Sequence, residues 1–190
     1  AHAAPLLCAG LIGFRAWRLA GEARQQRLGL YGFGAAAHII CQIAVAQGQD
    51  VYAFTRAGDT ASQNFARSLG AVWAGGSDGR PPVLLVAALI FAPVGALVPT
   101  ALAATRKGGT VVCAGIHMST IPAFDYGLLW GERVLRSVAN LTRADGEAFF
   151  RTVAAMSLKT HVQTFSLHDA NAAVQALREG QVQGAVVLLP

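Results

Sequence analysis

Short apolar runs alternate with amphipathic segments of helical length along most of this chain. Helices are expected over about 35–47, 60–69 and 95–106, each followed closely by a glycine. Six runs have the length and composition of buried strands: 28–31, 51–55, 71–74, 86–91, 110–114 and 134–140. This alternation predicts an α/β fold with a doubly wound parallel sheet, and right-handed crossovers give it the order 3-2-1-4-5-6.

Two helix boundaries and one proline carry specific local signals. Asp59 or Thr60 is expected to cap the helix that ends at Leu69. Pro99 is expected to bend the helix over 95–106 or to start a second register in it. Lys107-Gly108-Gly109 is expected to close that helix, because a cation and a glycine suit a helix C-terminus.

The two ends of the chain follow a different pattern. Residues 1–10 are expected to be an irregular entry into a helix over 11–21. Capping patterns at Thr142–Asp145 and Ser166–Asp169 predict helices over about 146–157 and 169–178, followed by a strand over 185–189. Because six strands are already used by residue 140, this last strand is expected to pair elsewhere.

Composition favours a parallel sheet buried on both faces, since 54% of residues are hydrophobic and only 13% are charged. The net charge of +5 comes from scattered cations and not from a block, so no nucleic-acid partner is expected. Residues 83–104 carry no charge over a length that could cross a bilayer. Pro93, Gly95 and Pro99 interrupt that stretch, so a buried strand, turn and helix are expected there and no membrane span.

Cys8, Cys41 and Cys113 are odd in number and lack C-x-x-C spacing, which favours a reducing compartment and a cytoplasmic location. The chain begins with Ala, and residues 1–14 contain no basic leader region, so no signal peptide is expected. This beginning resembles the interior of a larger protein.

A G-x-G-x-x-A pattern lies between the first predicted strand and the helix that follows it. Gly32 is expected to make the sharp turn, Gly34 to let the backbone approach a phosphate, and Ala37 to let the helix pack closely on the strand. The helix N-terminus offers free N–H groups and a positive dipole end. The pattern predicts a dinucleotide pyrophosphate site in a Rossmann fold, with an ordinary strand–helix turn as the alternative.

Other candidate residues follow the carboxyl ends of the predicted strands. Arg56 stands 19 positions after Ala37, where an acidic residue would hold the ribose 2′-hydroxyl of NAD. An arginine there favours the 2′-phosphate of NADP, with NAD, or a solvated loop arginine, as the alternative. The remaining candidate cofactor contacts share one rim with these glycines: Phe33, Ala35, Ala92, Gly115, Ile116 and His117.

No catalytic residue is assigned. His38 is expected to be a packed or hydrogen-bonded histidine of the helix and not a catalyst. Ser166, His168 and Asp169 lie together in sequence, but helix capping explains Ser166 and Asp169 better than a catalytic triad does. Trp130–Arg133 is expected either to brace the sixth strand or to take part in a subunit contact.

Three segments resemble the medium-chain zinc-dependent alcohol dehydrogenases: Ala4-Pro5-Leu6-Leu7-Cys8-Ala9-Gly10, Tyr31-Gly32-Phe33-Gly34-Ala35 and Lys107-Gly108-Gly109-Thr110-Val111-Val112. The resemblance implies a cofactor domain over 1–140 and, over 141–190, a segment that returns to a catalytic domain largely absent from this chain. It also implies that Gly115 and Ile116 line the nicotinamide and that the edge of the sixth strand forms a homodimer.

Cys8, which stands 24 residues before Gly32, matches a zinc ligand of that family. It cannot hold the metal alone, since a catalytic zinc needs about three protein ligands; a small buried thiol is the alternative. The resemblance implies that the intact parent transfers a hydride between NADP(H) or NAD(H) and an alcohol or aldehyde. This chain alone is expected to bind cofactor with little turnover. A non-catalytic dinucleotide-binding module, or a truncated remnant, is the alternative.

Overall fold

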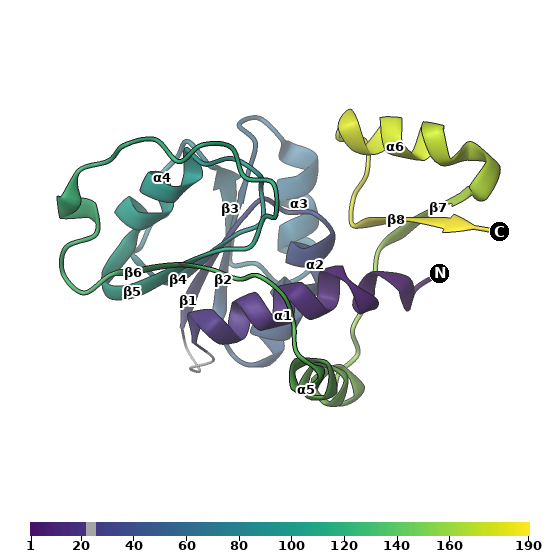
Figure 1. Cartoon of the computed structure of the whole chain (residues 1–190), viewed down its shortest axis with the longest axis horizontal. Helices are drawn as coiled ribbons and strands as arrows, with labels where there is room; N and C mark the ends of the chain where they lie inside the picture. The colour runs from purple at the N-terminus through teal and green to yellow at the C-terminus, as the bar shows by residue number, and fades with distance from the viewer. Residues whose placement is uncertain (22–25) are drawn as a thin grey trace.

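A computed structural model describes residues 1–21 and 26–190 and contains a six-stranded and a two-stranded sheet (Figure 1). The strands are β1 (Arg27–Tyr31), β2 (Asp50–Thr55), β3 (Trp73–Gly76), β4 (Leu85–Ile90), β5 (Thr105–Cys113), β6 (Val134–Ser137), β7 (Val162–Ser166) and β8 (Ala185–Leu189). The α-helices are α1 (Ala9–Ala20), α2 (Ala35–Ala46), α3 (Thr60–Ser68), α4 (Leu97–Ala104), α5 (Arg143–Ala154) and α6 (Ala170–Arg178). Short 3-10 turns are η1 (Ala4–Leu7), η2 (Tyr126–Leu128) and η3 (Leu167–Asp169).

The larger sheet is parallel and has the order β3-β2-β1-β4-β5-β6, as the sequence predicts. In the register, Leu28 of β1 stands beside Val51 of β2 on one side and Ala87 of β4 on the other. Successive strands are therefore added toward one edge of the sheet from β1 to β3 and toward the other edge from β4 to β6, so the order reverses between β1 and β4. Ligands of such sheets bind outside the carboxyl ends of the strands at this switch point.

Alternating side chains of β1 enter two separate cores. Leu28 and Leu30 are fully buried in the core that also holds residues of α1, α2 and α3. Tyr31 lies on the opposite face in the core under α4, where its ring stacks on that of Phe54 with centroids 4.0 Å apart. Helices thus cover both faces of the sheet, which explains why its strands are apolar throughout.

The junction between α4 and β5 differs from the prediction. The helix ends at Ala104, and Thr105 already begins β5, so residues 107–109 lie in the strand and do not close the helix. The pairing with β4 shifts between Leu85 and Ala87, and Gly108 takes φ +70° at this irregularity. The cation and glycines mark a β-bulge, which uses the same residue types as a helix terminus.

Pro99 is the third residue of α4, so it neither bends the helix nor starts a second register. Amide groups in the first helical turn have no partner within the helix, and a proline there loses no hydrogen bond. Asp59 caps α3, as expected, by accepting a hydrogen bond from the Ser62 amide.

The third strand begins two residues later than predicted. The Ala71 amide bonds to the Ala66 carbonyl, so the end of α3 uses this residue, and Gly75 and Gly76 extend the strand instead. The sixth strand is shorter than predicted and ends at Ser137.

The chain after β6 contains a strand that the sequence analysis missed. Residues 162–166 form β7, which pairs in parallel with β8 as a separate sheet, so the last strand does pair elsewhere as expected. Thr142 and Asp145 form the predicted capping box on α5, which begins earlier than predicted at Arg143. Ser166, by contrast, caps the short η3 turn, and Asp169 precedes α6 without a side-chain cap.

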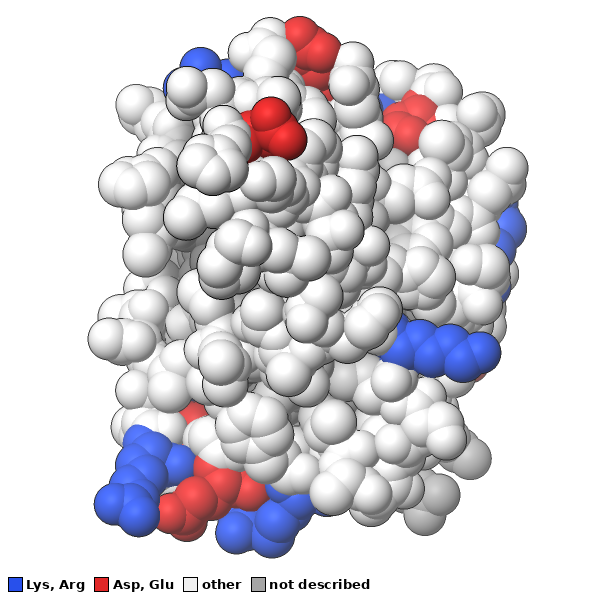
Figure 2. All heavy atoms as spheres, turned by 90° about the vertical axis from the view of Figure 1, so that its right-hand side faces the viewer, with Lys and Arg blue, Asp and Glu red and all other residues white. Residues whose placement is uncertain are grey.

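The side of the molecule that bears α6, β8 and the N-terminus has few charged side chains, and most of these lie near its margins (Figure 2). Exposed large apolar residues of the tail belong to this region: Leu167, Val174, Leu177, Leu188 and Leu189. No helix among residues 1–21 and 26–190 is long and apolar enough to cross a membrane.

Candidate functional site

The glycine turn between β1 and α2 is held in place by the neighbouring strands. The Gly32 amide donates to the Phe54 carbonyl of β2 at 2.8 Å, and the Ala92 amide donates to the Tyr31 carbonyl at 3.1 Å. Gly32 adopts φ +89°, and a Cβ on it would lie 2.8 Å from the Ala92 nitrogen. Only glycine fits both the backbone angle and the space.

Gly34, unlike the crowded Gly32, has open space around it. It is the extended, exposed N-cap residue of α2, and a Cβ built on it would meet no atom of residues 1–21 or 26–190 within 4 Å. Next to Gly34, the amide groups of Ala35, Ala36 and Ala37 form the first turn of α2 and have no helical acceptor. No acidic side chain occupies the first turn. An anion such as a pyrophosphate therefore fits here, with the dipole of α2 favouring it.

Two further residues of the pattern, Ala37 and Phe33, serve packing. Ala37 is fully buried, where α2 lies against the sheet, in the position that the pattern reserves for a small residue. Phe33 is 9% exposed and packs edge-on against Phe65 of α3, with ring centroids 5.8 Å apart. Any contact of Phe33 with a cofactor would therefore come from its backbone, whereas half-buried Ala35 offers an amide at the start of α2.

The ends of the other central strands lie beside this turn. Gly115, which follows β5, lies next to the residues after β4: a Cβ on it would be 3.8 Å from the Ala92 carbonyl oxygen. The Ala114 amide bonds to the Ile90 carbonyl at 2.8 Å and keeps the two loops together. The structure thus brings Gly32, Ala92 and Gly115 to one rim, at the switch point between β1 and β4.

Ile116 and His117 extend from this rim into solvent. Ile116 is 83% exposed, an unusual environment for an isoleucine, and His117 is also exposed. Their loop connects β5 to η2 and exposes the apolar side chains of Ile116 and Ile121.

Arg56 directly follows β2 and is exposed. Its guanidinium lies near the C-terminal end of α6, since a Cβ on Gly180 would be 3.5 Å from Arg56 Nη1. The cation therefore stands at the carboxyl end of β2, on the same edge of the sheet as the glycine turn. Asp59 is engaged in capping α3.

His38 is buried beneath the turn and does not face the open space. Its Nδ1 lies 3.4 Å from the Gly34 carbonyl oxygen, and its Nε2 accepts a hydrogen bond from the His161 amide at 3.3 Å. Burial, more than any other effect, lowers the pKa of His38, with the nearby His161 adding to it and the Gly34 carbonyl opposing it. The packed role expected of His38 is confirmed.

Cys8 is exposed between η1 and α1, so the alternative of a small buried thiol is wrong. Across residues 1–21 and 26–190, no group of three or more His, Cys, Asp or Glu side chains could hold a metal ion. Cys41 is buried and hydrogen-bonds weakly to the Leu69 carbonyl, and Cys113 is partly buried at the end of β5. Burial raises the pKa of both thiols, which makes them poor ligands and nucleophiles.

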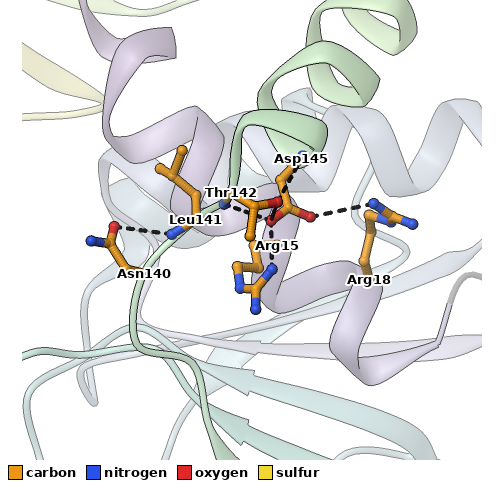
Figure 3. A network of polar contacts seen from close by, with 6 residues as sticks. All are labelled: Arg15, Arg18, Asn140, Leu141, Thr142 and Asp145. Carbon is orange, nitrogen blue, oxygen red and sulfur yellow. Dashed lines mark hydrogen bonds and ion pairs between the residues drawn. The ribbon is translucent and has the colours of Figure 1, made fainter.

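A buried polar node between α1 and α5 escaped the sequence analysis. Asp145 forms ion pairs with Arg15 at 2.5 Å and with Arg18 at 3.3 Å, and accepts hydrogen bonds from the amide and hydroxyl of Thr142 (Figure 3). Burial raises the pKa of Asp145, but the hydrogen bonds from Thr142 and Arg15 outweigh it and hold the pKa at about 2. The capping pattern identifies Thr142 and Asp145, but their partners lie some 130 residues earlier.

A large open pocket of about 840 Å³ lies away from the glycine turn. Its lining includes Lys107 and Arg133, near the starts of β5 and β6, at the amino-terminal edge of the sheet. Lys107 Nζ stands 5.0 Å from the ring centroid of Trp130, and Arg133 donates to the carbonyls of Thr105 and Trp130. Trp130 and Arg133 thus brace the entry into β6.

No family model matches the chain. It is 44% identical to a probable alcohol dehydrogenase, AdhA, of Mycobacterium tuberculosis (strain CDC 1551 / Oshkosh), over 98% of this chain and 54% of that protein. It is 26% identical to an alcohol dehydrogenase of Moraxella sp. (strain TAE123), over 97% of this chain and 56% of that protein. The chain thus spans about half the length of these curated relatives.

Solved structures share the fold at low sequence identity. Acetophenone reductase from Geotrichum candidum in complex with NAD is 22% identical over 99% of this chain and 55% of its own, with a TM-score of 0.86. CAD from Helicobacter pylori complexed with NADP(H) is 19% identical over 97% and 54%, with a TM-score of 0.82. The cobalt- and zinc-bound thermostable alcohol dehydrogenase from Pyrobaculum aerophilum is 22% identical over 100% and 57%, with a TM-score of 0.87.

Over nearly its whole length, this chain with its Rossmann-type sheet is therefore homologous to about half the length of the alcohol dehydrogenases that it matches.

Proposed function

We propose that this chain is the cofactor-binding portion of a zinc-type alcohol dehydrogenase that uses NADP(H). The observation that carries the proposal is the cradle formed by Gly32 and Gly34 at the N-terminus of α2, at the switch point of the sheet. The parent would pass a hydride between the nicotinamide and an alcohol or aldehyde substrate. The names of the curated relatives support this reaction class.

The pyrophosphate of the cofactor would bind at the amides of the first turn of α2. Gly34 would leave the space for it, and Ala35 would supply one of the donors. The exposed loop with Ile116 and His117, together with Ala92 and Gly115, would line the nicotinamide half of the cofactor. Ile116 would then cover an apolar ring face that water otherwise contacts.

Arg56 would select the cofactor. Its exposed guanidinium at the carboxyl end of β2 can form charge-assisted hydrogen bonds with a 2′-phosphate. An arginine offers no acceptor for the 2′-hydroxyl of NAD. NADP is therefore the proposed cofactor, and NAD is the alternative.

Cys8 would be one ligand of the catalytic zinc. Its thiol is exposed and could meet ligands supplied from outside this chain, but the described part of the chain offers no complete ligand set. Zinc, when bound, acts as a Lewis acid that polarises the substrate oxygen. The chain by itself should therefore bind cofactor with little turnover.

We propose residues 1–140 as the dinucleotide domain and 141–190 as the segment that joins the catalytic domain. The exposed apolar side chains of α6 and β8, on the side of the molecule where few charged side chains lie (Figure 2), would be covered by that domain. The free edge of β6 would pair with a second copy of the chain in a homodimer. The thiols are unpaired, in keeping with a reducing cytoplasm.

A fluorescence titration with NADPH and NADH tests the cofactor assignment. The chain should bind NADPH more tightly, and Arg56→Ala should weaken NADPH binding about tenfold while leaving NADH binding unchanged. Arg151→Ala, at an exposed arginine on α5, is the matched control and should bind both cofactors as the unmodified chain does. Equal affinities for the two cofactors, or an unchanged NADPH affinity in Arg56→Ala, would contradict NADP selection.

Zinc analysis and alcohol oxidation by the parent test the enzyme class. A protein that binds NADPH but neither holds zinc nor oxidises alcohols would instead be a non-catalytic dinucleotide-binding module. Zinc-dependent turnover by the 190-residue chain would show that the ligand set is complete without further protein.

A further inference from the structure

Three residues between α5 and β7 lie against α2, and we refer to Lys159, Thr160 and His161 as the strap. The Gln42 side chain donates from Nε2 to the Lys159 carbonyl at 2.9 Å and accepts at Oε1 from the Lys159 amide at 3.0 Å. This double hydrogen bond satisfies both backbone groups of Lys159. It joins the strap to the second turn of α2.

His38 makes the second attachment, one helical turn before Gln42. Its Nε2 accepts from the His161 amide, which requires the proton of the neutral ring to be on Nδ1, facing the Gly34 carbonyl. A fully buried imidazole links the strap to the N-cap of α2. Gly34, the residue that leaves room for a phosphate, is thereby joined through His38 to the strap.

Aromatic rings connect the strap to the same turn by another route. The His161 ring packs edge-on against Phe65 of α3, with centroids 4.6 Å apart. Phe65 in turn packs edge-on against Phe33, which lies between the two glycines of the turn. The contacts thus form a closed circuit that begins at Phe33 and ends at Gly34.

The strap also fixes the small sheet. His161 directly precedes β7, and its carbonyl accepts from the Ala185 amide, the first residue of β8, at 2.9 Å. Gly184 adopts φ +80°, and a Cβ on it would overlap the His161 carbonyl oxygen at 2.3 Å. His161 is therefore attached to the first residue of both strands of the small sheet, to Val162 by the peptide bond and to Ala185 by the hydrogen bond.

We propose that the strap couples occupancy of the glycine turn to docking of the β7–β8 sheet, with His38 as the positioning residue. The inference rests on the proposed function, because the occupant is a nicotinamide dinucleotide. A pyrophosphate on the first turn of α2 holds Gly34 and, through its carbonyl, the imidazole that binds the strap. By linkage, the docked strap strengthens dinucleotide binding by the same factor.

Amide hydrogen exchange followed by mass spectrometry tests both the docking of the β7–β8 sheet by the strap and its coupling to dinucleotide binding. Saturating NADPH should slow exchange over 161–166 and 185–189 in the unmodified chain. Without ligand, His38→Leu should speed exchange there, since the His161 amide loses its acceptor, and should weaken NADPH binding about fivefold. His38→Gln, which retains an acceptor, should recover part of both effects.

Gln42→Ala provides a milder second variant if His38→Leu fails to fold, and should shift both readouts in the same direction. His168→Leu is the control, because this exposed histidine of the tail lies in η3 and not in the strap. Unchanged exchange in the His38 and Gln42 variants would overturn the docking role. Unchanged exchange on NADPH binding, with wild-type affinity in the variants, would overturn the coupling.

Failure of the proposed function gives a different result. If the unmodified chain binds neither NADPH nor NADH, the cofactor assignment and the coupling both fall. Exchange in the unliganded variants then still decides whether His38 and Gln42 hold the strap.

Discussion

Gly32 and Ala92 approach so closely that a Cβ on Gly32 would lie 2.8 Å from the nitrogen and 2.9 Å from the Cβ of Ala92. The contact holds the turn after β1 against the end of β4, the two strands that border the switch point. The first glycine of the pattern is thus required by the fold. Gly34, with open space around its Cβ position, is not.

Substitution of the two glycines should separate folding from binding. Gly32→Ala should lower the free energy of unfolding by about 2 kcal/mol, because alanine at φ +89° is strained and meets backbone atoms. Gly34→Ala should change stability little but weaken NADPH binding, since its methyl group enters the phosphate space. Urea denaturation and NADPH titration of both variants measure this; full NADPH affinity in Gly34→Ala would be evidence against a phosphate there.

Asp145→Asn should destabilise the chain by about 2 kcal/mol in urea denaturation at pH 7. The variant leaves Arg15 without its ion pair at a site where the Asp145 side chain is only 7% exposed. Glu147→Gln is the control, because its ion pair with Arg143 is exposed and should contribute less than about 0.5 kcal/mol. Equal effects of the two substitutions would show that the buried ion pairs of Asp145 contribute no more to the free energy of unfolding than the exposed pair of Arg143 and Glu147.

The Asp145 carboxylate should also make the free energy of unfolding depend on pH in the acidic range. The folded pKa of Asp145 is about 2, below the ordinary value of 3.8, so its contribution is complete above pH 3.8. It is lost as the pH falls from 3.8 toward 2. Unfolding curves of the unmodified chain and Asp145→Asn should therefore converge in this range, and a constant difference would contradict the lowered pKa.

His38 should make stability sensitive to mildly acidic pH. Its folded pKa is lowered from 6.5, so the unfolded chain takes up a proton first as the pH falls. The stabilising contribution is present above pH 6.5 and is lost below it, until the folded pKa is reached. The thermal midpoint of the unmodified chain should thus fall more between pH 7.5 and 5 than that of His38→Gln; parallel curves would remove His38 as the cause.

Tyr31→Phe should stabilise the chain by about 1 kcal/mol. The Tyr31 hydroxyl is buried, and within the described part of the chain it has no hydrogen-bond partner, while burial raises its pKa. Phenylalanine keeps the ring stacked on Phe54 and removes the unsatisfied oxygen. Tyr126→Phe, at a 71% exposed residue, should have no effect. A loss of stability in Tyr31→Phe would reveal a partner for its hydroxyl.

The predictions about regular elements failed where a residue type serves two purposes. Lys107 and the glycines after it suit a helix end and a β-bulge equally, and only the pairing of Leu85 with Thr105 decides for the bulge. Residues 162–166 alternate too weakly to indicate a strand, and β7 exists because β8 pairs with it. Ser166 has a capping pattern, but the chain forms η3 before α6 begins.

The sequence by itself determined the six-strand order and the place of the glycine turn. Both depend on local signals, namely strand length, helix caps and the spacing of Gly32, Gly34 and Ala37, together with the fixed hand of the crossovers. The tertiary structure alone decided that Asp145 meets Arg15 and that His161 binds His38. Those contacts join residues more than 120 positions apart, and no local propensity encodes them.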